Sequence, residues 1–127
     1  MNISKAAQAA ELPIKTVRYY ADIGLVEPVA RTKAQYRCYD DVAIQKLALV
    51  RRARKFGFSI SACRELLNLY TDNNRSSADV KKIASKRLAE IEERQRELQY
   101  LRDELAHLVK SCRGDDRPDC PIMNYLS

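Results

Sequence analysis

Two cysteines near the end of the sequence have the type and spacing to bind a metal ion. Cys112 and Cys120 enclose seven residues, among which Gly114 and Pro118 favour a loop. This spacing lacks the two close cysteine pairs of a zinc ribbon, and the loop contains no His. Thiolates select soft ions such as Cu(I), and Ag(I) and Au(I) share that softness and accept two ligands in a line. We therefore expect the pair to bind one monovalent soft ion, with a surface disulfide or two unused thiols as the alternatives.

The charge of such a site needs compensation. Two thiolates and one monovalent cation leave one negative charge. A short helix over residues 122–126 would direct the N–H groups of its N-terminus at that charge. Lys81 is a second candidate for compensation.

The remaining residues with reactive side chains do not form an enzyme site. Cys63 lies in an apolar helical pattern and is expected to be a small buried residue. Cys38 lies between two other wing residues, and a redox role is the minor alternative for it. His107, the only His, is expected on a helix surface rather than as a third metal ligand. Because the sequence has no Ser/His/Asp set, phosphate loop or HExxH motif, we predict that the protein is not an enzyme.

Positive charge is concentrated in the first part of the chain. Residues 1–58 carry 11 Lys+Arg and 5 Asp+Glu, whereas residues 59–127 carry 12 of each sign. The whole net charge of +6 therefore lies in the first segment. A basic segment joined to a neutral one favours a module that binds a polyanion, with a solvated basic face as the alternative.

Several side chains of the basic segment suit double-stranded DNA. Lys15, Arg18 and Tyr19 are at helical spacing, and Tyr20 follows directly. Lys and Arg can bind phosphates and guanine edges in the major groove, and Tyr hydroxyls can bind phosphate oxygens. One of the two tyrosines is expected to pack in the core. Further candidates are Arg31, Tyr36, Arg37 and Arg54.

The first elements are predicted to form a helix-turn-helix. Residues 4–10 are rich in Ala, and Ser4 can cap a helix there. A second helix is predicted over residues 14–23, with Pro13 in its first turn and Gly24 at its C-terminal end. Two short helices separated by three residues match helix-turn-helix spacing.

A small β-ribbon and two further helices are predicted to follow. Residues 29–39 lack a helical period and read as a wing. Asp40 can cap a helix that ends at Gly57, and Ser59 can start the next one. Residues 71–77 form a polar break. In the helix after the wing, the residues expected to face the core are Leu47, Val50 and Ala53.

The longest predicted element is a helix over residues 78–110. This stretch has no Gly or Pro, and apolar residues recur at steps of three, four and seven. Arg87, Arg94 and Gln95 interrupt the apolar stripe. A helix of this length would extend over roughly 45 Å, and a small monomer offers it little to pack against. A second copy of the same helix is the simplest partner, giving a coiled-coil-like homodimer, with packing inside one chain as the alternative.

The sequence gives no sign of membrane insertion or export. No apolar run approaches the roughly 18 residues of a transmembrane helix. The first residues lack a signal-peptide layout. We therefore expect a cytoplasmic protein without a membrane partner and with reduced thiols.

Motifs spread over nearly the whole chain resemble the MerR family of bacterial transcription regulators. They are Thr-Val-Arg-Tyr-Tyr at 16–20, Gly-Leu at 24–25, Arg31, Gln-Tyr-Arg-Cys-Tyr at 35–39 and Gly-Phe-Ser at 57–59. The resemblance implies a mostly α fold, with a winged helix-turn-helix head, an antiparallel dimer through the long helix, and a pseudo-palindromic promoter site. It implies that Tyr19 is structural. The implied DNA contacts are Lys15, Thr16, Arg18, Tyr20, Arg31, Tyr36, Arg37 and Arg54.

The predicted organisation follows from these motifs and patterns. It comprises a DNA-binding domain at 1–70 (helix-turn-helix about 4–23, wing about 29–39), a linker at 71–77, a dimerisation helix at 78–110, and a metal-binding loop with a short helix at 111–127.

The cysteine loop narrows the resemblance to the copper-efflux-regulator (CueR-type) branch of the family. The matching segments are Cys-Arg-Gly-Asp-Asp at 112–116 and Asp-Cys-Pro-Ile at 119–122. The resemblance implies that Cys112 and Cys120 bind Cu(I), Ag(I) or Au(I). It places Ser77 where divalent-metal sensors have a third cysteine, with Lys81 close by in the same motif.

This branch of the family implies a function as well as a site. The expected regulator distorts promoter DNA so that RNA polymerase activates copper-efflux and detoxification genes. The alternatives are a sensor of a divalent metal (Zn, Cd, Hg or Pb) and a thiol-redox-responsive regulator.

Overall fold

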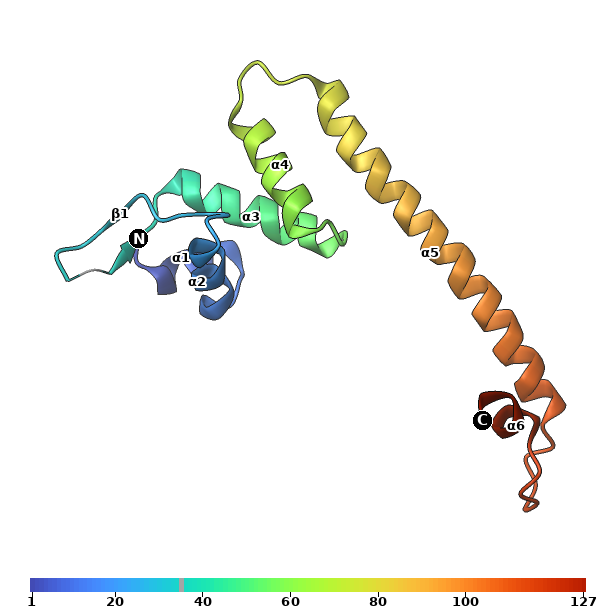
Figure 1. Cartoon of the computed structure of the whole chain (residues 1–127). Helices are drawn as coiled ribbons and strands as arrows, with labels where there is room; N and C mark the ends of the chain where they lie inside the picture. The colour runs from blue at the N-terminus through green and yellow to red at the C-terminus, as the bar shows by residue number, and fades with distance from the viewer. Residues whose placement is uncertain (35) are drawn as a thin grey trace. The chain divides into compact units, whose positions relative to one another are not determined.

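The computed structural model describes every residue except Gln35, which belongs to the wing motif. The described residues form six helices and one two-stranded sheet, as the prediction of a mostly α fold requires (Figure 1). The chain divides into two compact units, residues 1–84 and 85–127. No helix of the described residues combines the length and apolar content of a membrane span.

Helix α1 (Ile3–Ala10) has its N-cap two residues earlier than predicted. The N-cap is Asn2, whose side-chain oxygen accepts a hydrogen bond from the N–H of Lys5 at 2.9 Å. Ser4 lies inside the helix, so its assignment as the cap is wrong. The helix ends at Glu11, which adopts a left-handed conformation with φ 58° and turns the chain toward α2.

Helix α2 (Ile14–Asp22) is the second helix of the predicted helix-turn-helix. Pro13 is its N-cap and has extended backbone angles, so it lies one position before the predicted first turn. At the other end Gly24 has φ +70°, a conformation that glycine adopts without a Cβ clash. Its place just after the helix agrees with its predicted role in ending α2.

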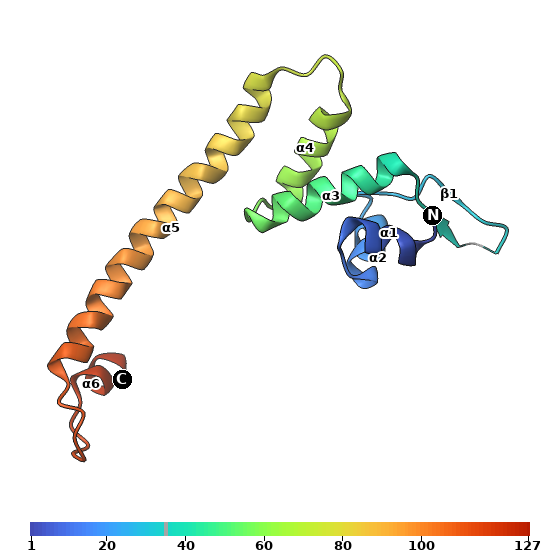
Figure 2. The ribbon, with the colours of Figure 1, turned by 180° about the vertical axis from the view of Figure 1, so that it is seen from behind.

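The predicted wing is a short antiparallel hairpin. Strands β1 (Ala30–Arg31) and β2 (Arg37–Cys38) pair in the register Ala30 with Cys38 and Arg31 with Arg37. Both views of the ribbon show the hairpin extending away from the helices of its unit (Figure 2). Tyr39, at the base of the wing, is 1% exposed and anchors the hairpin in the core.

Helices α3 (Asp41–Lys55) and α4 (Ile60–Thr71) complete the core of the first unit. Asp40 caps α3 by accepting a hydrogen bond from the N–H of Ala43 at 2.8 Å. Helix α3 packs against both α1 and α4. The prediction for its core face is confirmed, because its buried residues include Leu47, Val50 and Ala53.

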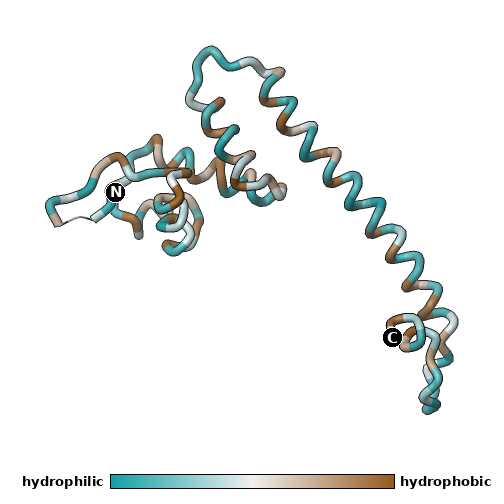
Figure 3. The backbone as a smooth tube through the Cα atoms, in the orientation of Figure 1, coloured by the Kyte–Doolittle hydropathy of each residue, from teal (hydrophilic) through white to brown (hydrophobic). Residues whose placement is uncertain are grey.

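Helix α5 (Ser77–Ser111) has 35 residues and extends one residue beyond the predicted helix at each end. None of its residues is buried in the single chain. Hydrophobic and hydrophilic residues alternate along it (Figure 3). The short helix α6 (Pro121–Leu126) follows the cysteine loop in the second unit.

Candidate metal centre and DNA-binding face

The loop between α5 and α6 brings the two candidate metal ligands together. The Sγ atoms of Cys112 and Cys120 lie 3.3 Å apart, and both residues are half-buried free cysteines. A disulfide has an S–S distance of about 2.05 Å, so this is a pair of thiols in contact. Cys112 directly follows α5, and its N–H donates to the carbonyl of Leu108 at 3.1 Å. Cys120 is the N-cap of α6.

The start of α6 stabilises the thiolate of Cys120. The backbone N–H of Met123, the thiol of Cys112 and the backbone N–H of Ile122 all donate to its sulfur, in that order of effect. Together they lower the pKa of Cys120 below its ordinary value. A negatively charged sulfur at this position is therefore more populated at neutral pH than in a free cysteine.

One side-chain hydrogen bond fastens α6 to α5. The Tyr125 hydroxyl donates to Oε1 of Glu104 at 2.6 Å. The bond and the charge of Glu104 raise the pKa of Tyr125, because both favour the protonated phenol. This bond links the last turn of α6 to α5.

The other predicted residues of the metal centre lie in the first unit. Ser77 is the first residue of α5, and Lys81 follows one turn later; both are exposed. His107 is exposed on α5, as predicted. Among the described residues, no three His, Cys, Asp or Glu side chains form a group that could hold a metal ion.

The predicted recognition residues Lys15, Arg18 and Tyr20 lie on α2, but the buried tyrosine is Tyr20 and not Tyr19. Lys15 and Arg18 are exposed. Tyr19 is 52% exposed, whereas Tyr20 is 6% exposed, so the prediction that Tyr19 is the structural one is wrong. Tyr20 lies three residues after the fully buried Val17 and therefore shares its core-facing side of the helix. This three-residue spacing is the feature of the sequence that indicates burial of Tyr20.

Burial also changes the acidity of Tyr20. Desolvation raises its pKa, and the nearby Arg54 opposes the rise through its charge and a hydrogen bond. The hydroxyl expected to bind DNA therefore lies beside Arg54 in the protein. Thr16, a further predicted contact on α2, is half-buried.

The wing residues divide into free and tethered side chains. Arg31 is exposed, and Tyr36 is 70% exposed. Arg37 instead forms an ion pair with Asp22, with 2.6 Å between Nη2 and Oδ1. Its second guanidinium nitrogen donates to the carbonyl of Arg18 at 3.4 Å. Arg37 therefore fastens the wing to α2, a contact that depends on Asp22, which sequence reasoning missed.

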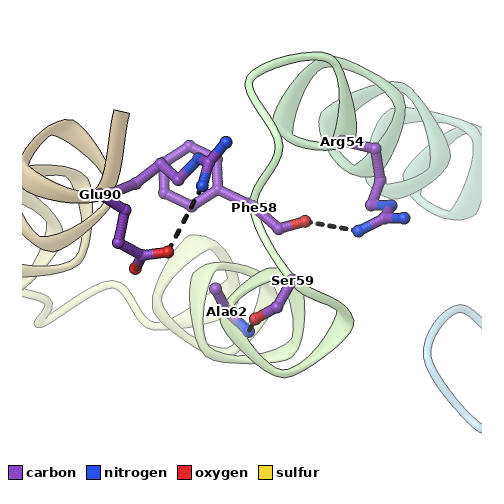
Figure 4. Close-up of polar contacts among 6 residues, drawn as sticks. Arg54, Phe58, Ser59, Ala62 and Glu90 are labelled. Atoms are coloured by element: carbon purple, nitrogen blue, oxygen red, sulfur yellow. Dashed lines mark hydrogen bonds and ion pairs between the residues drawn. The ribbon is translucent and has the colours of Figure 1, made fainter. Parts of the chain in front are cut away.

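Arg54, predicted to contact DNA, also supports the turn between α3 and α4. Its Nη1 donates to the carbonyl of Phe58 at 2.7 Å (Figure 4). Next to it, the Ser59 hydroxyl accepts from the N–H of Ala62 at 3.0 Å and caps α4. Arg54 as a whole is exposed.

Sequence reasoning also missed Arg64, an exposed residue of α4. Its guanidinium donates to the carbonyls of Gly24 and Ile23, at 3.0 and 3.2 Å. These carbonyls lie just after α2, so Arg64 joins α4 to the end of the helix that carries Lys15 and Arg18.

Comparisons with known proteins agree with this arrangement. The family described as "MerR HTH family regulatory protein" matches residues 1–69, and the one described as "MerR, DNA binding" matches residues 44–108. The HTH-type transcriptional regulator HmrR of Rhizobium leguminosarum bv. viciae is 50% identical, over 100% of this chain and 98% of its own. The regulator CueR of Salmonella typhimurium is 46% identical, over 100% of this chain and 92% of its own.

The chain is also similar to a transcription regulator of solved structure. The transcription regulator PbrR691 from Ralstonia metallidurans CH34, crystallised with lead(II), has a TM-score of 0.85 and 31% identity. The match covers 100% of this chain and 99% of that one. The chain therefore belongs to the MerR family, whose members are DNA-binding transcription regulators and not enzymes.

Proposed function

We propose that this regulator binds promoter DNA as a homodimer and activates copper-efflux and detoxification genes when Cu(I) binds to Cys112 and Cys120. Ag(I) and Au(I) are expected to bind at the same place. The observation that carries the proposal is the pair of free, half-buried thiols whose Sγ atoms lie 3.3 Å apart. Thiolates are the protein ligands that soft monovalent ions prefer.

The thiol pair fits such an ion after a small opening of the loop. With metal–sulfur bonds of about 2.3 Å, two thiolates in line with an ion are about 4.6 Å apart, so the sulfurs must separate by about 1.3 Å. Gly114 has φ +66° and no atom within 4 Å of where its Cβ would be. The loop therefore has space to adjust around an ion.

The surroundings of Cys120 support a thiolate at this position. The lowered pKa of Cys120 favours the deprotonated form that binds metal. Ser77 occupies the position where the family resemblance expects a third cysteine in divalent-metal sensors. A serine there withholds the third thiolate, so the site offers two sulfur ligands, which favours a monovalent soft ion that accepts two ligands in a line over Zn(II) or Hg(II).

The similarity to CueR and HmrR supports a response at the promoter. We expect the dimer to bind promoter DNA with and without metal. The ion orders the cysteine loop and shifts the dimer between two states. In the metal-bound state the DNA is bent and undertwisted, which lets RNA polymerase engage the promoter.

A divalent-metal sensor is the second candidate, because the similar regulator PbrR691 was crystallised with lead(II). A run-off transcription assay distinguishes the two. The template is a promoter fragment that the protein itself retains from genomic DNA of its source. Free Cu(I), Ag(I), Zn(II), Pb(II) and Hg(II) are each held at buffered concentrations. We expect Cu(I) and Ag(I) to induce at the lowest free concentrations.

Serine variants test the two ligands. Cys112→Ser and Cys120→Ser should retain promoter binding but lose induction, whereas the matched control Cys38→Ser should retain both. Induction that survives in either ligand variant contradicts the two-thiolate site. Stronger induction by Pb(II) or Zn(II) than by Cu(I) supports the divalent sensor, and induction by a thiol oxidant without metal supports redox sensing.

A further inference from the structure

Arg64 forms a direct side-chain link between α4 and the end of α2. Its Nη1 donates to the carbonyl of Gly24 at 3.0 Å, and its Nη2 donates to the carbonyl of Ile23 at 3.2 Å. The two partners are 40 and 41 residues away in the sequence. A planar guanidinium can reach both acceptors at once because its donors form a rigid fork.

The end of α2 is a place where such donors are needed. The last carbonyls of a helix and of the turn after it have no partner within the helix. The N–H groups of Leu25 and Val26 both return to the carbonyl of Tyr20, at 2.9 and 3.2 Å. Arg64 supplies donors for the carbonyls of Ile23 and Gly24 in this turn, and its positive charge is favourable at the negative end of the helix dipole.

Side-chain hydrogen bonds from other elements reach α2 near its C-terminal end. Its N-cap, Pro13, makes no side-chain hydrogen bond to the helix. Near the other end, Arg54 of α3 lies against the Tyr20 hydroxyl, and Arg64 of α4 holds the turn that follows. Arginines from α3 and α4 therefore add to the wing residue Arg37 and to the packing of α2 on α1 in holding the orientation of Lys15 and Arg18.

We propose that Arg64 is a positioning residue for DNA recognition: it fixes the direction of α2 relative to α4 and thereby sets sequence specificity. The inference rests on the proposed function, in which α2 reads DNA. Helix α4 is followed by residues 72–76 and then by α5. Arg64 thus joins the recognition helix to the helix that leads into α5.

A positioning role and a phosphate contact have different signatures. Removal of an arginine that neutralises a phosphate weakens binding to all sequences. The slope of log affinity against log salt concentration then decreases in magnitude by about one. An arginine that orients the recognition helix affects base contacts, which only the preferred sequence makes. Its removal lowers the ratio of specific to non-specific affinity and leaves the salt dependence unchanged.

The test compares Arg64→Ala and Arg64→Lys with the unchanged protein. The probes are a duplex that the unchanged full chain selects from a random-sequence pool and a scrambled duplex of equal composition, each titrated over a salt series. We expect Arg64→Ala to bind the selected duplex about tenfold more weakly and the scrambled duplex equally well. The affinity of Arg64→Lys for the selected duplex should lie between those of Arg64→Ala and the unchanged protein, because an ammonium group cannot span both carbonyls.

Two control variants accompany them. Asn68→Ala changes another exposed side chain of α4, and Lys86→Ala removes one exposed positive charge from α5. Both should keep the specificity ratio of the unchanged protein. Thermal unfolding is measured for all variants, and Arg64→Lys carries the test if Arg64→Ala does not fold.

A second measurement does not require DNA. Amide hydrogen exchange at Leu25 and Val26 should become faster in Arg64→Ala and less so in Arg64→Lys, because the turn after α2 is then less constrained. Equal loss of affinity on both duplexes with a reduced salt dependence shows a phosphate contact and overturns the inference. So does an unchanged specificity ratio with unchanged exchange. If the unchanged protein prefers no duplex, the proposed function fails, and the exchange rates alone decide whether Arg64 positions α2.

Discussion

At the scale of single residues, two cysteines of this chain have opposite environments. Cys63 is fully buried in the core of the first unit, and burial raises the pKa of its thiol. Cys120 accepts hydrogen bonds from Met123, Cys112 and Ile122, which lower the pKa of its thiol. Only the thiolate is the nucleophile, so the same reagent should distinguish the two residues.

Alkylation by iodoacetamide at pH 7 should therefore be faster at Cys120 than at Cys63, by more than about tenfold. Mass spectrometry of peptides after timed quenching measures both rates in one sample. In concentrated urea the two rates should become similar, which serves as the control. Cu(I) added before the reagent should protect Cys112 and Cys120 and leave Cys63 unchanged. Equal native rates would contradict the environments described above.

Single residues also show which parts of the site the sequence could predict. The loop position of Cys112 and Cys120 followed from Gly114 and Pro118 between them. The three-residue spacing between Val17 and Tyr20 indicates that Tyr20 is the buried tyrosine, whereas the family resemblance favours Tyr19. The ion pair between Arg37 and Asp22 joins residues 15 apart through the fold of the wing, so only the structure could reveal it.

At the scale of elements, helix caps were predicted where a single candidate stood before the helix. Asp40 and Ser59 were assigned correctly, and each makes the expected hydrogen bond. For α1 two good caps lie two positions apart in the sequence. A contact with the wing decides between these two caps. Asn2 forms a β-bridge with Cys38, so the chain is extended at Asn2 and the helix begins directly after it. That tertiary contact could not be read from local preferences.

The Asp40 cap gives a test of this local reasoning. Asp40→Ala removes the acceptor for the N–H of Ala43 and should lower the free energy of unfolding by about 1 kcal/mol. The matched control Asp41→Ala removes the carboxylate from the first turn of α3 and only its interaction with the helix dipole, worth about 0.5 kcal/mol. Urea unfolding followed by circular dichroism, at one protein concentration, measures both. A larger loss for Asp41→Ala than for Asp40→Ala would contradict the cap.

At the scale of the whole molecule, α5 is a long helix without a buried residue in the single chain. Its 35 residues correspond to about 52 Å. The sequence predicted this helix well because its periodicity is local and uninterrupted by Gly or Pro. Large apolar side chains are exposed along it, at 53–58% for Leu98, Leu101 and Leu105. A helix with such a stripe is stable only when the stripe is covered.

We expect a second copy of α5 to cover this stripe, so the chain should sediment as a dimer. Leu98→Asp places a charge at the interface in both copies at once. Each lost leucine removes about 1.5–3 kcal/mol of apolar burial, so the dissociation constant should rise by more than about a hundredfold. Ala89→Asp introduces the same charge at an exposed position outside the stripe and should leave the dimer intact. Analytical ultracentrifugation over a concentration series measures both variants. A monomeric unchanged protein, or a Leu98→Asp variant as tightly associated as Ala89→Asp, would show that α5 is covered in some other way.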